Sequence, residues 1–354
     1  MRFHPLTVAA VEPLTDDAAA VTFAVPDDLR EAFAFAPGQS VTLRRVLAGA
    51  EHRRTYSICA PVGSAPRIGV REIPDGLFSS WLVRDVRAGD VVEVEPPRGA
   101  FRADPATPAR HLCIAAGSGI TPMLSIAASV LAAGPTAEVA LLYGNRTTGS
   151  VMFSEEIGDL KNAHGPRLQV VHVLSREPRD VDLFSGRLDA DRLRRLLGDV
   201  DGALVPVADF DHVWLCGPHA MIADARAVLV GLGVPPERVH AELFYVDEPP
   251  PDVRRDRPAP TGATSEVTVV LDGVASTSTV ERGQTLLEGA QATRSDVPFA
   301  CKGGVCGTCR ALVRSGEVDM RRNYALDDDE VARGFVLTCQ SVPVTAQVTV
   351  DFDA

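Results

Sequence analysis

The sequence predicts a protein of three parts: an antiparallel β-barrel, a doubly wound α/β domain and a small α+β domain. Three observations support this division. Short alternating strands extend to about residue 105, apolar runs alternate with helical stretches to about residue 247, and a segment with closely spaced cysteines follows a proline-rich stretch. With 354 residues, the chain is long enough for two or three domains that each bury a core.

Residues 1–105 have the pattern of a small barrel. Segments 40–44 and 91–95 alternate apolar and polar residues, and Pro-Gly or Ala-Gly pairs separate such segments. Alternation with a period of two places one side of each strand in a core, and frequent turns suit antiparallel neighbours.

Residues 106–247 predict a parallel, doubly wound sheet. Apolar runs lie at 111–116, 139–143, 168–174 and 212–216, and a helical stretch or a loop follows each of them. Alternation of strands with helices favours parallel connections between the strands.

Residues 248–263 are predicted to be a linker, and residues 264–354 to be a third domain. The linker is dense in proline and charge, which prevents a packed core and favours an extended tether. Beyond it, residues 267–273 predict a new strand and turn.

The composition excludes several classes of protein. The net charge of −12 argues against binding to nucleic acid or to an anionic membrane surface. No apolar run approaches transmembrane length, and residues 1–5 lack the apolar region of a signal peptide, so we expect a soluble cytoplasmic protein. Seven cysteines, four of them clustered, do not suggest a disulfide framework. Cys59 and Cys113 are expected to be small buried apolar residues.

Cys301, Cys306, Cys309 and Cys339 follow the pattern C-x4-C-x2-C, with 29 residues before the fourth cysteine. Thiolates at this spacing can enclose a two-iron, two-sulfur cluster of the plant type. The glycines between residues 301 and 309 allow backbone N–H groups to turn toward an anionic cluster. The alternatives are a zinc ribbon, which usually has paired C-x2-C units, or free thiols that lie together by chance.

Segment 54–57, Arg-Thr-Tyr-Ser, combines groups that suit a flavin nucleotide. An arginine can donate two hydrogen bonds to a phosphate, a tyrosine offers a ring face, and a serine hydroxyl can meet the polar edge of an isoalloxazine. Segment 71–82 predicts a loop and a helix, in which the backbone amides of Gly76 to Ser79 can bind a pyrophosphate. The alternatives are an exposed arginine beside a half-buried tyrosine, and an ordinary serine-capped helix.

Segment 115–122, Ala-Ala-Gly-Ser-Gly-Ile-Thr-Pro, directly follows an apolar strand. Gly-x-Gly at a strand-to-helix turn permits close approach of a dinucleotide, and Pro122 suits the first helical position. The segment is not the G-x-G-x-x-G fingerprint of ordinary dehydrogenases. Cys216 ends another strand and precedes Gly217 and Pro218, a position that favours function over a buried core thiol.

Together these motifs resemble the ferredoxin–NADP reductase superfamily, and within it the three-part oxygenase reductases with flavin, nicotinamide and [2Fe–2S] domains. The resemblance covers essentially the whole chain. It implies that Arg54 holds the flavin phosphate, Tyr56 packs on the flavin and Ser57 hydrogen-bonds near its reactive nitrogen. It also places Thr121 and Cys216 where nicotinamide meets flavin, so that Ser57, Thr121 and Cys216 form the implied catalytic set. The implied cofactor-binding residues are Arg54, Tyr56, Ser57, Arg71, Gly76, Leu77, Phe78, Ser79, Gly117, Ser118, Gly119, Thr121, Pro122, Arg146, Ser175, Arg176, Cys216, Gly217, Pro218 and Phe244, and the metal ligands are Cys301, Cys306, Cys309 and Cys339.

The choice between nicotinamide cofactors depends on the 2′-phosphate. Ser175 and Arg176 stand where NADP-using members of the superfamily carry a Ser-Arg pair, and Arg146 can join them. An arginine fork suits a 2′-phosphate, whereas NAD-using proteins tend to place an acid near the ribose. Only Lys161 and Lys302 among the 35 basic residues are lysines, so a single arginine is weak support. NADPH is favoured with NADH left open, and FAD is favoured over FMN.

The resemblance implies that electrons pass from NADPH through FAD and the cluster to a multicomponent oxygenase. Reductases of Rieske oxygenases and of steroid hydroxylases share this architecture, so the partner and its substrate stay open. A redox sensor without enzyme activity is an alternative that the intact motifs disfavour. The linker is expected to let the cysteine domain swing between flavin and oxygenase. The acids 327–330 either offset a helix dipole or face a basic surface on the partner.

Overall fold

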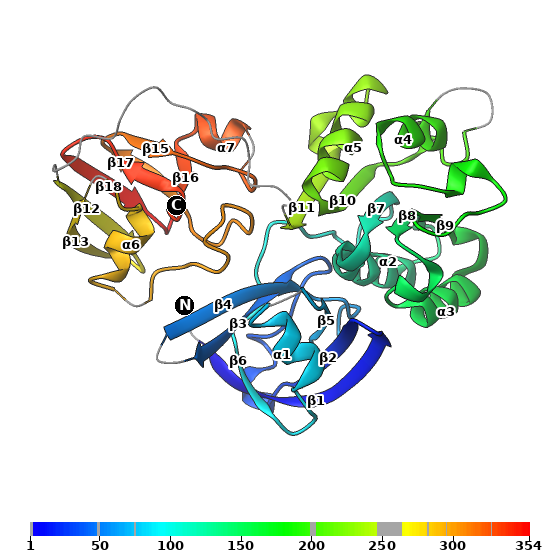
Figure 1. Ribbon diagram of the computed structural model, residues 1–354, viewed down its shortest axis with the longest axis horizontal. Coiled ribbons are helices and arrows are strands. Elements are labelled where there is room, and N and C mark those ends of the chain that lie inside the picture. The colour runs from blue at the N-terminus through cyan, green and yellow to red at the C-terminus, as the bar shows by residue number, and fades with distance from the viewer. Residues whose placement is uncertain are drawn as a thin grey trace. The chain divides into compact units, whose positions relative to one another are not determined.

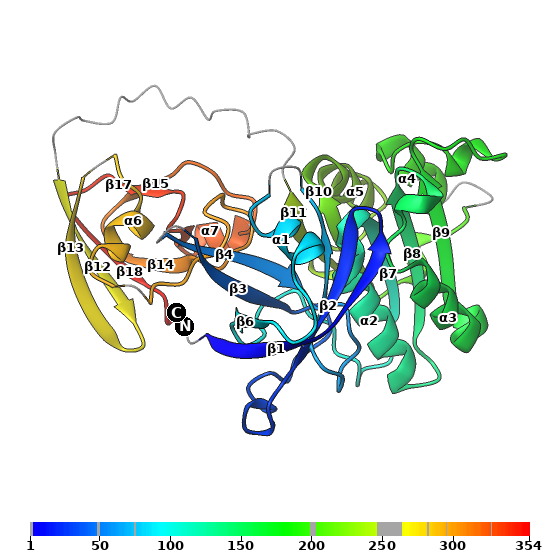
Figure 2. The same cartoon turned by 60° about the horizontal axis from the view of Figure 1, so that its bottom comes forward.

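Figures 1 and 2 show two views of the protein as a computed structural model. The structure describes residues 3–47, 50–73, 76–198, 203–245, 264–281, 283–294, 296–326 and 328–354. The predicted linker, residues 248–263, lies outside the described residues. Within them the chain forms two compact units, one built from residues 3–45 and 56–245, and the other from the described parts of 46–55 and 264–354.

The N-terminal part is a six-stranded sheet with the strand order β4-β3-β6-β1-β2-β5. Its described pairs β1–β2, β1–β6, β2–β5 and β3–β6 are antiparallel, which confirms the predicted class. Leu6 and Val8 on β1 are buried, whereas their neighbours are not, so the alternation seen in the sequence does point one face inward. The elements are β1 (His4–Thr15), β2 (Ala18–Ala24), β3 (Ser40–Leu47), β4 (Ala50–Ser57), β5 (Arg67–Arg71), α1 (Ser79–Arg84) and β6 (Val91–Val94).

The middle part is a five-stranded parallel sheet with the order β11-β10-β7-β8-β9, as predicted. Strand β8 is buried along nearly its whole length, because helices cover both faces of the sheet. Its elements are β7 (Arg110–Ala116), α2 (Ile120–Ala133), β8 (Glu138–Asn145), α3 (Ser154–His164), β9 (Leu168–Leu174), α4 (Ala190–Leu197), β10 (His212–Pro218), α5 (His219–Gly231) and β11 (Val239–Tyr245).

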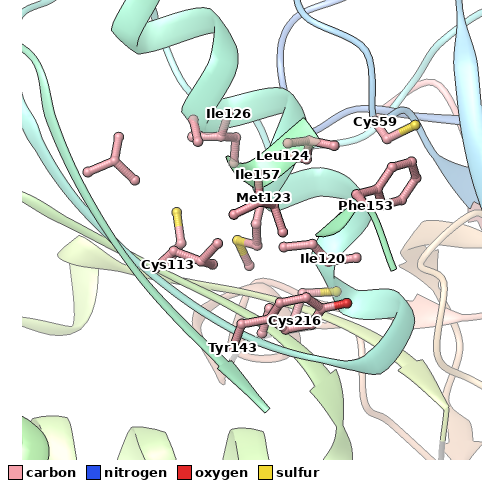
Figure 3. Packing of buried hydrophobic residues seen from close by; sticks show 14 of the residues in the cluster. Cys59, Cys113, Ile120, Met123, Leu124, Ile126, Tyr143, Phe153, Ile157 and Cys216 are labelled. Atoms are coloured by element: carbon pink, nitrogen blue, oxygen red, sulfur yellow. The ribbon is translucent and has the colours of Figure 1, made fainter. Parts of the chain in front are cut away.

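Two separate apolar clusters lie on the two faces of this sheet. Helices α2 and α3 pack on one face, where Cys113 of β7 and Ile120 of α2 belong to the same cluster (Figure 3). Helices α4 and α5 pack on the other face, against the alternate residues Leu112 and Ile114 of β7. Cys59 and Cys113 are buried thiols, as expected, and burial raises the pKa of each to about 12.

Helix α2 begins two residues earlier than the sequence suggested. Residues 117–119 form a single 3-10 turn, and α2 starts at Ile120, so Pro122 is its third residue rather than its first. Proline is still tolerated there because the first turn of a helix has no intrahelical acceptors for its N–H groups.

The barrel packs directly on α2 through Gly69 of β5. A Cβ atom at Gly69 would lie 2.7 Å from Thr121 Cγ2 and 2.7 Å from Phe153 Cζ. Any side chain larger than hydrogen would therefore separate the barrel strand from the start of α2. This contact fixes the barrel relative to the parallel sheet within one compact unit.

The C-terminal part is a mixed sheet with the order β13-β12-β18-β14-β16 and a two-stranded β15–β17 ribbon. Helix α6 begins with a capping box in which Thr285 Oγ1 accepts from the Glu288 N–H and Glu288 accepts from the Thr285 N–H. Its elements are β12 (Thr264–Leu271), β13 (Val274–Glu281), α6 (Leu286–Gln291), β14 (Arg310–Ser315), β15 (Val318–Met320), α7 (Asp328–Ala332), β16 (Phe335–Leu337), β17 (Ser341–Pro343) and β18 (Gln347–Asp351). No helix among the described residues is long and apolar enough to cross a bilayer.

Three histidines and a tryptophan stack near the amino-terminal ends of the parallel strands. His240 stacks on Trp214 with ring centroids 4.2 Å apart, and Trp214 Nε1 donates to His111 Nδ1 at 3.1 Å. His212 stacks on His111, and Phe101 meets Trp214 edge-on. Burial, together with the nearby His212, lowers the pKa of His111 and of His240 to about 4. The histidines His111 and His240 are therefore neutral in the folded protein at pH 7.

We predict that this array makes the larger compact unit sensitive to acid. Unfolded histidines bind protons near their ordinary pKa of 6.5, whereas folded His111 and His240 remain neutral until about pH 4. The stabilisation is thus present above pH 6.5 and is lost as the pH falls toward 4, by up to about 1.4 kcal/mol per pH unit for His111 and by less for the more exposed His240, whose charge is screened by solvent. Urea unfolding followed by tryptophan fluorescence from pH 7.5 to 4.5 measures this loss.

The variant His240→Phe retains a ring against Trp214 but cannot take up a proton. It should show a shallower loss of stability with falling pH than the wild type. The matched control is His219→Gln, at an exposed histidine at the start of α5. Equal slopes in wild type and His240→Phe would contradict the prediction.

Candidate functional site

The loop that carries the first three cysteines is shaped by backbone conformations that favour glycine. Gly304 and Gly307 have φ values of 79° and 68°, and Lys302 adopts the same left-handed region at 54°. The turn directs the N–H groups of Gly303 and Val305 at Cys301 Sγ, at 3.3 and 3.4 Å. The backbone therefore stabilises a thiolate at Cys301, as the glycine pattern predicted.

The four thiols come together as two pairs. Cys301 is hydrogen-bonded to Cys306, and Cys309 is hydrogen-bonded to Cys339, the residue that follows β16 and its loop. The pKa of Cys301 is lowered to about 5 by the Cys306 thiol and by the backbone N–H groups, and the Cys309 thiol lowers the pKa of Cys339. Among the described residues, no three cysteine, histidine or acidic side chains surround a position for a single ion. Two pairs of cysteine sulfurs match the donor set of two irons joined by sulfides.

Strand β4 carries the predicted flavin motif. Arg54 is exposed, and its Nη1 donates to the Arg53 carbonyl oxygen at 2.7 Å. The adjacent Arg53 is buried instead and forms an ion pair with Glu51 at 2.6 Å. Tyr56 is half-buried, so part of its ring stays accessible. The exposed position of Arg54 suits an arginine that holds a phosphate.

The predicted phosphate loop precedes α1. The Gly76 N–H donates to the Ile73 carbonyl oxygen, and Ser79 Oγ accepts from the Ile73 N–H at 3.0 Å. Ser79 is thus the first residue of α1 and does not cap it, in contrast to the ordinary capped helix considered from the sequence. Phe78 is buried and anchors the loop, while Leu77 is exposed. The residues 74 and 75 lie outside the described chain.

Arg71, at the end of β5, joins the barrel to the nucleotide loop. Its Nη2 donates to the Ser150 carbonyl oxygen, and its Nε lies 3.3 Å from Asp17 Oδ1. A Cβ atom at Gly117 would lie 3.3 Å from Arg71 Nη1. The guanidinium is therefore held in place beside the loop in which the sequence predicted a dinucleotide.

The nucleotide loop packs on the end of β10. A Cβ atom at Gly119 would overlap the Cys216 carbonyl oxygen, so only glycine permits this approach. The Tyr143 hydroxyl donates to the Gly117 carbonyl oxygen at 2.9 Å and supports the loop from below. Thr121 is fully buried, and its Oγ1 donates to the Ser118 carbonyl oxygen at 3.0 Å. Figure 3 shows Tyr143 and Cys216 close together beneath the start of α2.

A buried carboxyl group links the two halves of the unit. Glu242 on β11 pairs in register with Cys216 on β10, and Ser57 Oγ of β4 donates to Glu242 Oε2 at 2.7 Å. Burial raises the pKa of Glu242 to about 7, although the Ser57 hydrogen bond opposes the rise. Burial and the nearby Glu242 also raise the pKa of the Cys216 thiol well above its usual range, so Cys216 is uncharged. The sequence-predicted Ser57 and Cys216 are thus both adjacent to one titratable group.

The carboxyl ends of β8 and β9 hold the predicted 2′-phosphate residues. The Arg176 N–H donates to the Arg146 carbonyl oxygen at 2.8 Å, so the two arginines are adjacent, and both are exposed. Glu177 accepts from the Thr148 N–H and Oγ1, both at 2.7 Å, which ties the two loops together. Two exposed arginines on loops that are hydrogen-bonded to each other can bind a phosphate.

Two further residues of the site were not identified as site residues from the sequence. Glu242 lies within β11, the last strand of the parallel sheet along the chain. The side-chain nitrogen and oxygen of buried Asn145 have no hydrogen-bond partner within the described residues. An unsatisfied buried amide at the carboxyl end of a parallel strand fits a polar ligand such as a dinucleotide. The only sequence signal was a polar side chain at the end of an apolar strand for Asn145, and a carboxyl group within a strand for Glu242.

The remaining predicted residues extend the same region. Gly217 lies close to Ala116 and Met221, and Pro218 ends β10 and precedes α5. Phe244 is half-buried and packs on the α2-side cluster. Their roles toward a cofactor stay predictions.

Comparisons with known proteins agree with this geometry. The family models that match are an oxidoreductase FAD-binding domain over residues 5–103, an oxidoreductase NAD-binding domain over 113–227 and a 2Fe-2S iron-sulfur cluster binding domain over 269–344. Fold and site together thus define a flavin- and cluster-dependent oxidoreductase. The prediction of FAD, a nicotinamide cofactor and a [2Fe–2S] cluster is confirmed.

Among curated proteins, a component of 1,2-phenylacetyl-CoA epoxidase from Escherichia coli (strain K12) is 42% identical, with 99% of this chain and 98% of that protein covered. The ferredoxin reductase component of 3-ketosteroid-9-alpha-monooxygenase from Rhodococcus rhodochrous is 36% identical, with 98% and 96% covered. The solved structure of phthalate dioxygenase reductase has the same fold, with a TM-score of 0.58, 24% identity and 99% and 98% of the chains covered. The chain belongs to the family of oxygenase reductases with FAD, nicotinamide and [2Fe–2S] domains.

The chemistry of the site follows from these residues. A bound flavin takes two electrons as a hydride and passes them on singly, which links a nicotinamide to a one-electron cluster. When the Glu242 carboxyl is neutral, its O–H can donate a hydrogen bond to Ser57 Oγ. The Ser57 hydroxyl can then donate a hydrogen bond to another group. When Glu242 is ionised, it can only accept, so Ser57 donates to Glu242 across the same 2.7 Å contact. Glu242 therefore decides whether the Ser57 hydroxyl can donate to a cofactor.

We predict that flavin reduction depends on this switch. The rate should fall as the pH rises through about 7, because ionised Glu242 then holds the Ser57 proton. In Glu242→Gln the amide can donate to Ser57 Oγ at any pH, so the decline near pH 7 should disappear. Stopped-flow measurement of flavin bleaching by NADPH between pH 5.5 and 8.5 tests this. A decline that persists in Glu242→Gln would assign the titration to another group.

Proposed function

We propose that this protein is the NADPH-dependent reductase of a phenylacetyl-CoA epoxidase. It passes electrons through FAD and the [2Fe–2S] cluster to the diiron oxygenase of phenylacetate degradation, in the cytoplasm. The full-length similarity to the epoxidase component, 42% against 36% for the ketosteroid reductase, carries the choice of partner. Segments 3–8, 53–59, 323–326 and 334–340 support the same choice from the sequence.

The domain organisation belongs to this proposal. A flavin-binding barrel at 1–105 and a nicotinamide domain at 106–247 reduce the cluster domain at 264–354, and residues 248–263 tether it. The contacts of Ser57, Thr121 and Cys216 around the end of β10 support their catalytic assignment. The exposed, adjacent Arg146 and Arg176 support NADPH over NADH.

Reconstitution tests the choice of partner. The purified protein, NADPH and the oxygenase components of the Escherichia coli epoxidase should convert phenylacetyl-CoA with oxygen consumption. The oxygenase component of the 3-ketosteroid system with its steroid is the comparison, because a steroid partner is the second candidate. Faster turnover with the steroid oxygenase would show that the steroid oxygenase, and not the epoxidase, is the partner.

The cofactor proposal predicts a selective effect at Arg176. Arg176→Ala should raise the apparent KM for NADPH and barely change that for NADH, because only NADPH carries the 2′-phosphate. The loss of one charge-assisted contact costs about 1.5–3 kcal/mol, or roughly ten- to over a hundred-fold. Steady-state ferricyanide reduction gives both constants. Arg194→Ala, an exposed arginine on α4 that pairs with Asp191, is the matched control. Equal effects on both cofactors would exclude Arg176 as the phosphate contact.

The cluster should be separable from the flavin chemistry. Cys306→Ala removes one thiol of the Cys301–Cys306 pair and should abolish the visible absorption of the cluster. Ferricyanide takes electrons directly from the flavin, so NADPH-dependent ferricyanide reduction should stay close to that of the wild type. A retained rate would also exclude a redox sensor without enzyme activity. Loss of both properties together would show that the flavin part does not work independently.

A further inference from the structure

Three backbone segments run side by side around the cysteine loop. Gln340, which follows the ligand Cys339, donates from Nε2 to the Lys302 carbonyl oxygen at 2.8 Å. The Arg321 N–H donates to the Gln340 carbonyl oxygen at 2.8 Å, and the segment continues along the loop through Arg322. A Cβ atom at Gly304 would lie 3.2 Å from the Arg322 carbonyl oxygen. Basic residues from distant parts of the sequence are thereby fixed beside the cluster ligands.

These three residues are accessible cations. Lys302 is the only exposed residue in the loop 301–309, and its ammonium lies 4.8 Å from the Phe299 ring and 3.3 Å from Gln291 Oε1. Arg321 is exposed, and Arg322 is half-buried. Within the described residues, none of the three forms an ion pair. We call Lys302, Arg321 and Arg322 the basic face.

Three acidic residues of the cluster domain are held by groups outside the basic face. Glu330 pairs with Arg310 at 2.9 Å, Asp296 pairs with Arg294 at 2.7 Å, and Glu288 closes the capping box of α6. The acids of residues 328–330 occupy the first turns of α7, which agrees with their interpretation as helix-dipole partners. Asp327 lies outside the described residues. The acidic run is thus a weaker docking candidate than the basic face.

We propose that the basic face docks the cluster domain on an acidic surface that surrounds the electron acceptor of the partner oxygenase. This inference refines the proposed function, because it assumes a protein acceptor. The chain as a whole carries a charge of −12, so an acidic partner would be repelled from most of it. A local positive surface beside the cluster would direct the encounter to the place where the electron leaves.

A different role for the same cations would be to offset the negative charge of the thiolate-bound cluster. That role would change the midpoint potential of the cluster, whereas docking would change only the association with a protein acceptor. The two roles are therefore separable by one potential measurement. They also differ in salt dependence, since docking between exposed charges is screened beyond about 10 Å at 0.1 M salt.

The test uses the full-length holoprotein and two protein acceptors of opposite charge. Cytochrome b5 is acidic and cytochrome c is basic, and the rate of Cys306→Ala is subtracted to remove electrons that leave the flavin directly. The triple variant Lys302→Gln/Arg321→Gln/Arg322→Gln should reduce cytochrome b5 about tenfold more slowly at low salt, and cytochrome c faster. Both differences should vanish at high salt. Arg314→Gln, an exposed arginine on β14 that pairs with Asp351, is the matched control.

Three further measurements complete the test. The midpoint potential of the cluster and the rate of its bleaching by NADPH should match the wild type. Equal effects on both cytochromes, or a potential shift large enough to explain the rates, would overturn the proposal. So would a larger effect from Asp329→Lys than from the triple variant. The epoxidase oxygenase could accept no electrons while the triple variant still slows cytochrome b5 reduction and speeds cytochrome c reduction. That result would support docking through the basic face and would contradict the proposed partner.

Discussion

The close approach of the nucleotide loop to the end of β10 positions the rest of the oxidoreductase unit. Because Gly119 has no side chain, the loop lies against the Cys216 carbonyl group, and α2 starts directly above the sheet. Thr121, the second residue of α2, then packs against Gly69 of the barrel. A side chain at either glycine would move α2 away from its neighbour. The distance between the barrel and the carboxyl edge of the sheet, and so the meeting of Ser57 with Glu242, follows from these two contacts.

The two redox parts of the molecule treat charge in opposite ways. Around Ser57 and Cys216 the thiol is kept neutral, and the single carboxyl group has a pKa of about 7, so a proton can be held or released near neutral pH. Around the cysteine loop, backbone N–H groups and paired thiols favour thiolates at Cys301 and Cys339. Deprotonated thiols are the form that binds metal, so the second arrangement suits an iron–sulfur cluster.

Local motifs were predictable because each depends on residues that are close together in the sequence. The cysteine spacing, the Gly-x-Gly turn and the strand patterns each indicated a backbone shape within a few residues, and the fold bears these out. The start of α2 was misplaced by two residues because a 3-10 turn at 117–119 leads into the helix, and no residue type distinguishes that turn from a loop. The alternative of a serine-capped helix is not what the structure has, since no side chain caps α1 and the Ser79 hydroxyl accepts from Ile73.

The sequence by itself determined the three-part architecture and the cofactor types and predicted the cysteines that would hold the cluster, because periodicity and short motifs act over a single turn or strand. Only the tertiary structure showed that Glu242 meets Ser57, that the amide of Asn145 lacks a partner among the described residues and that the backbones of Lys302, Arg321 and Arg322 lie along the cysteine loop and the residue after Cys339. Each of these depends on residues far apart in the chain. Their burial, their pKa values and the charges around them depend on which strands pack side by side. The order of the strands along the sequence does not determine that packing.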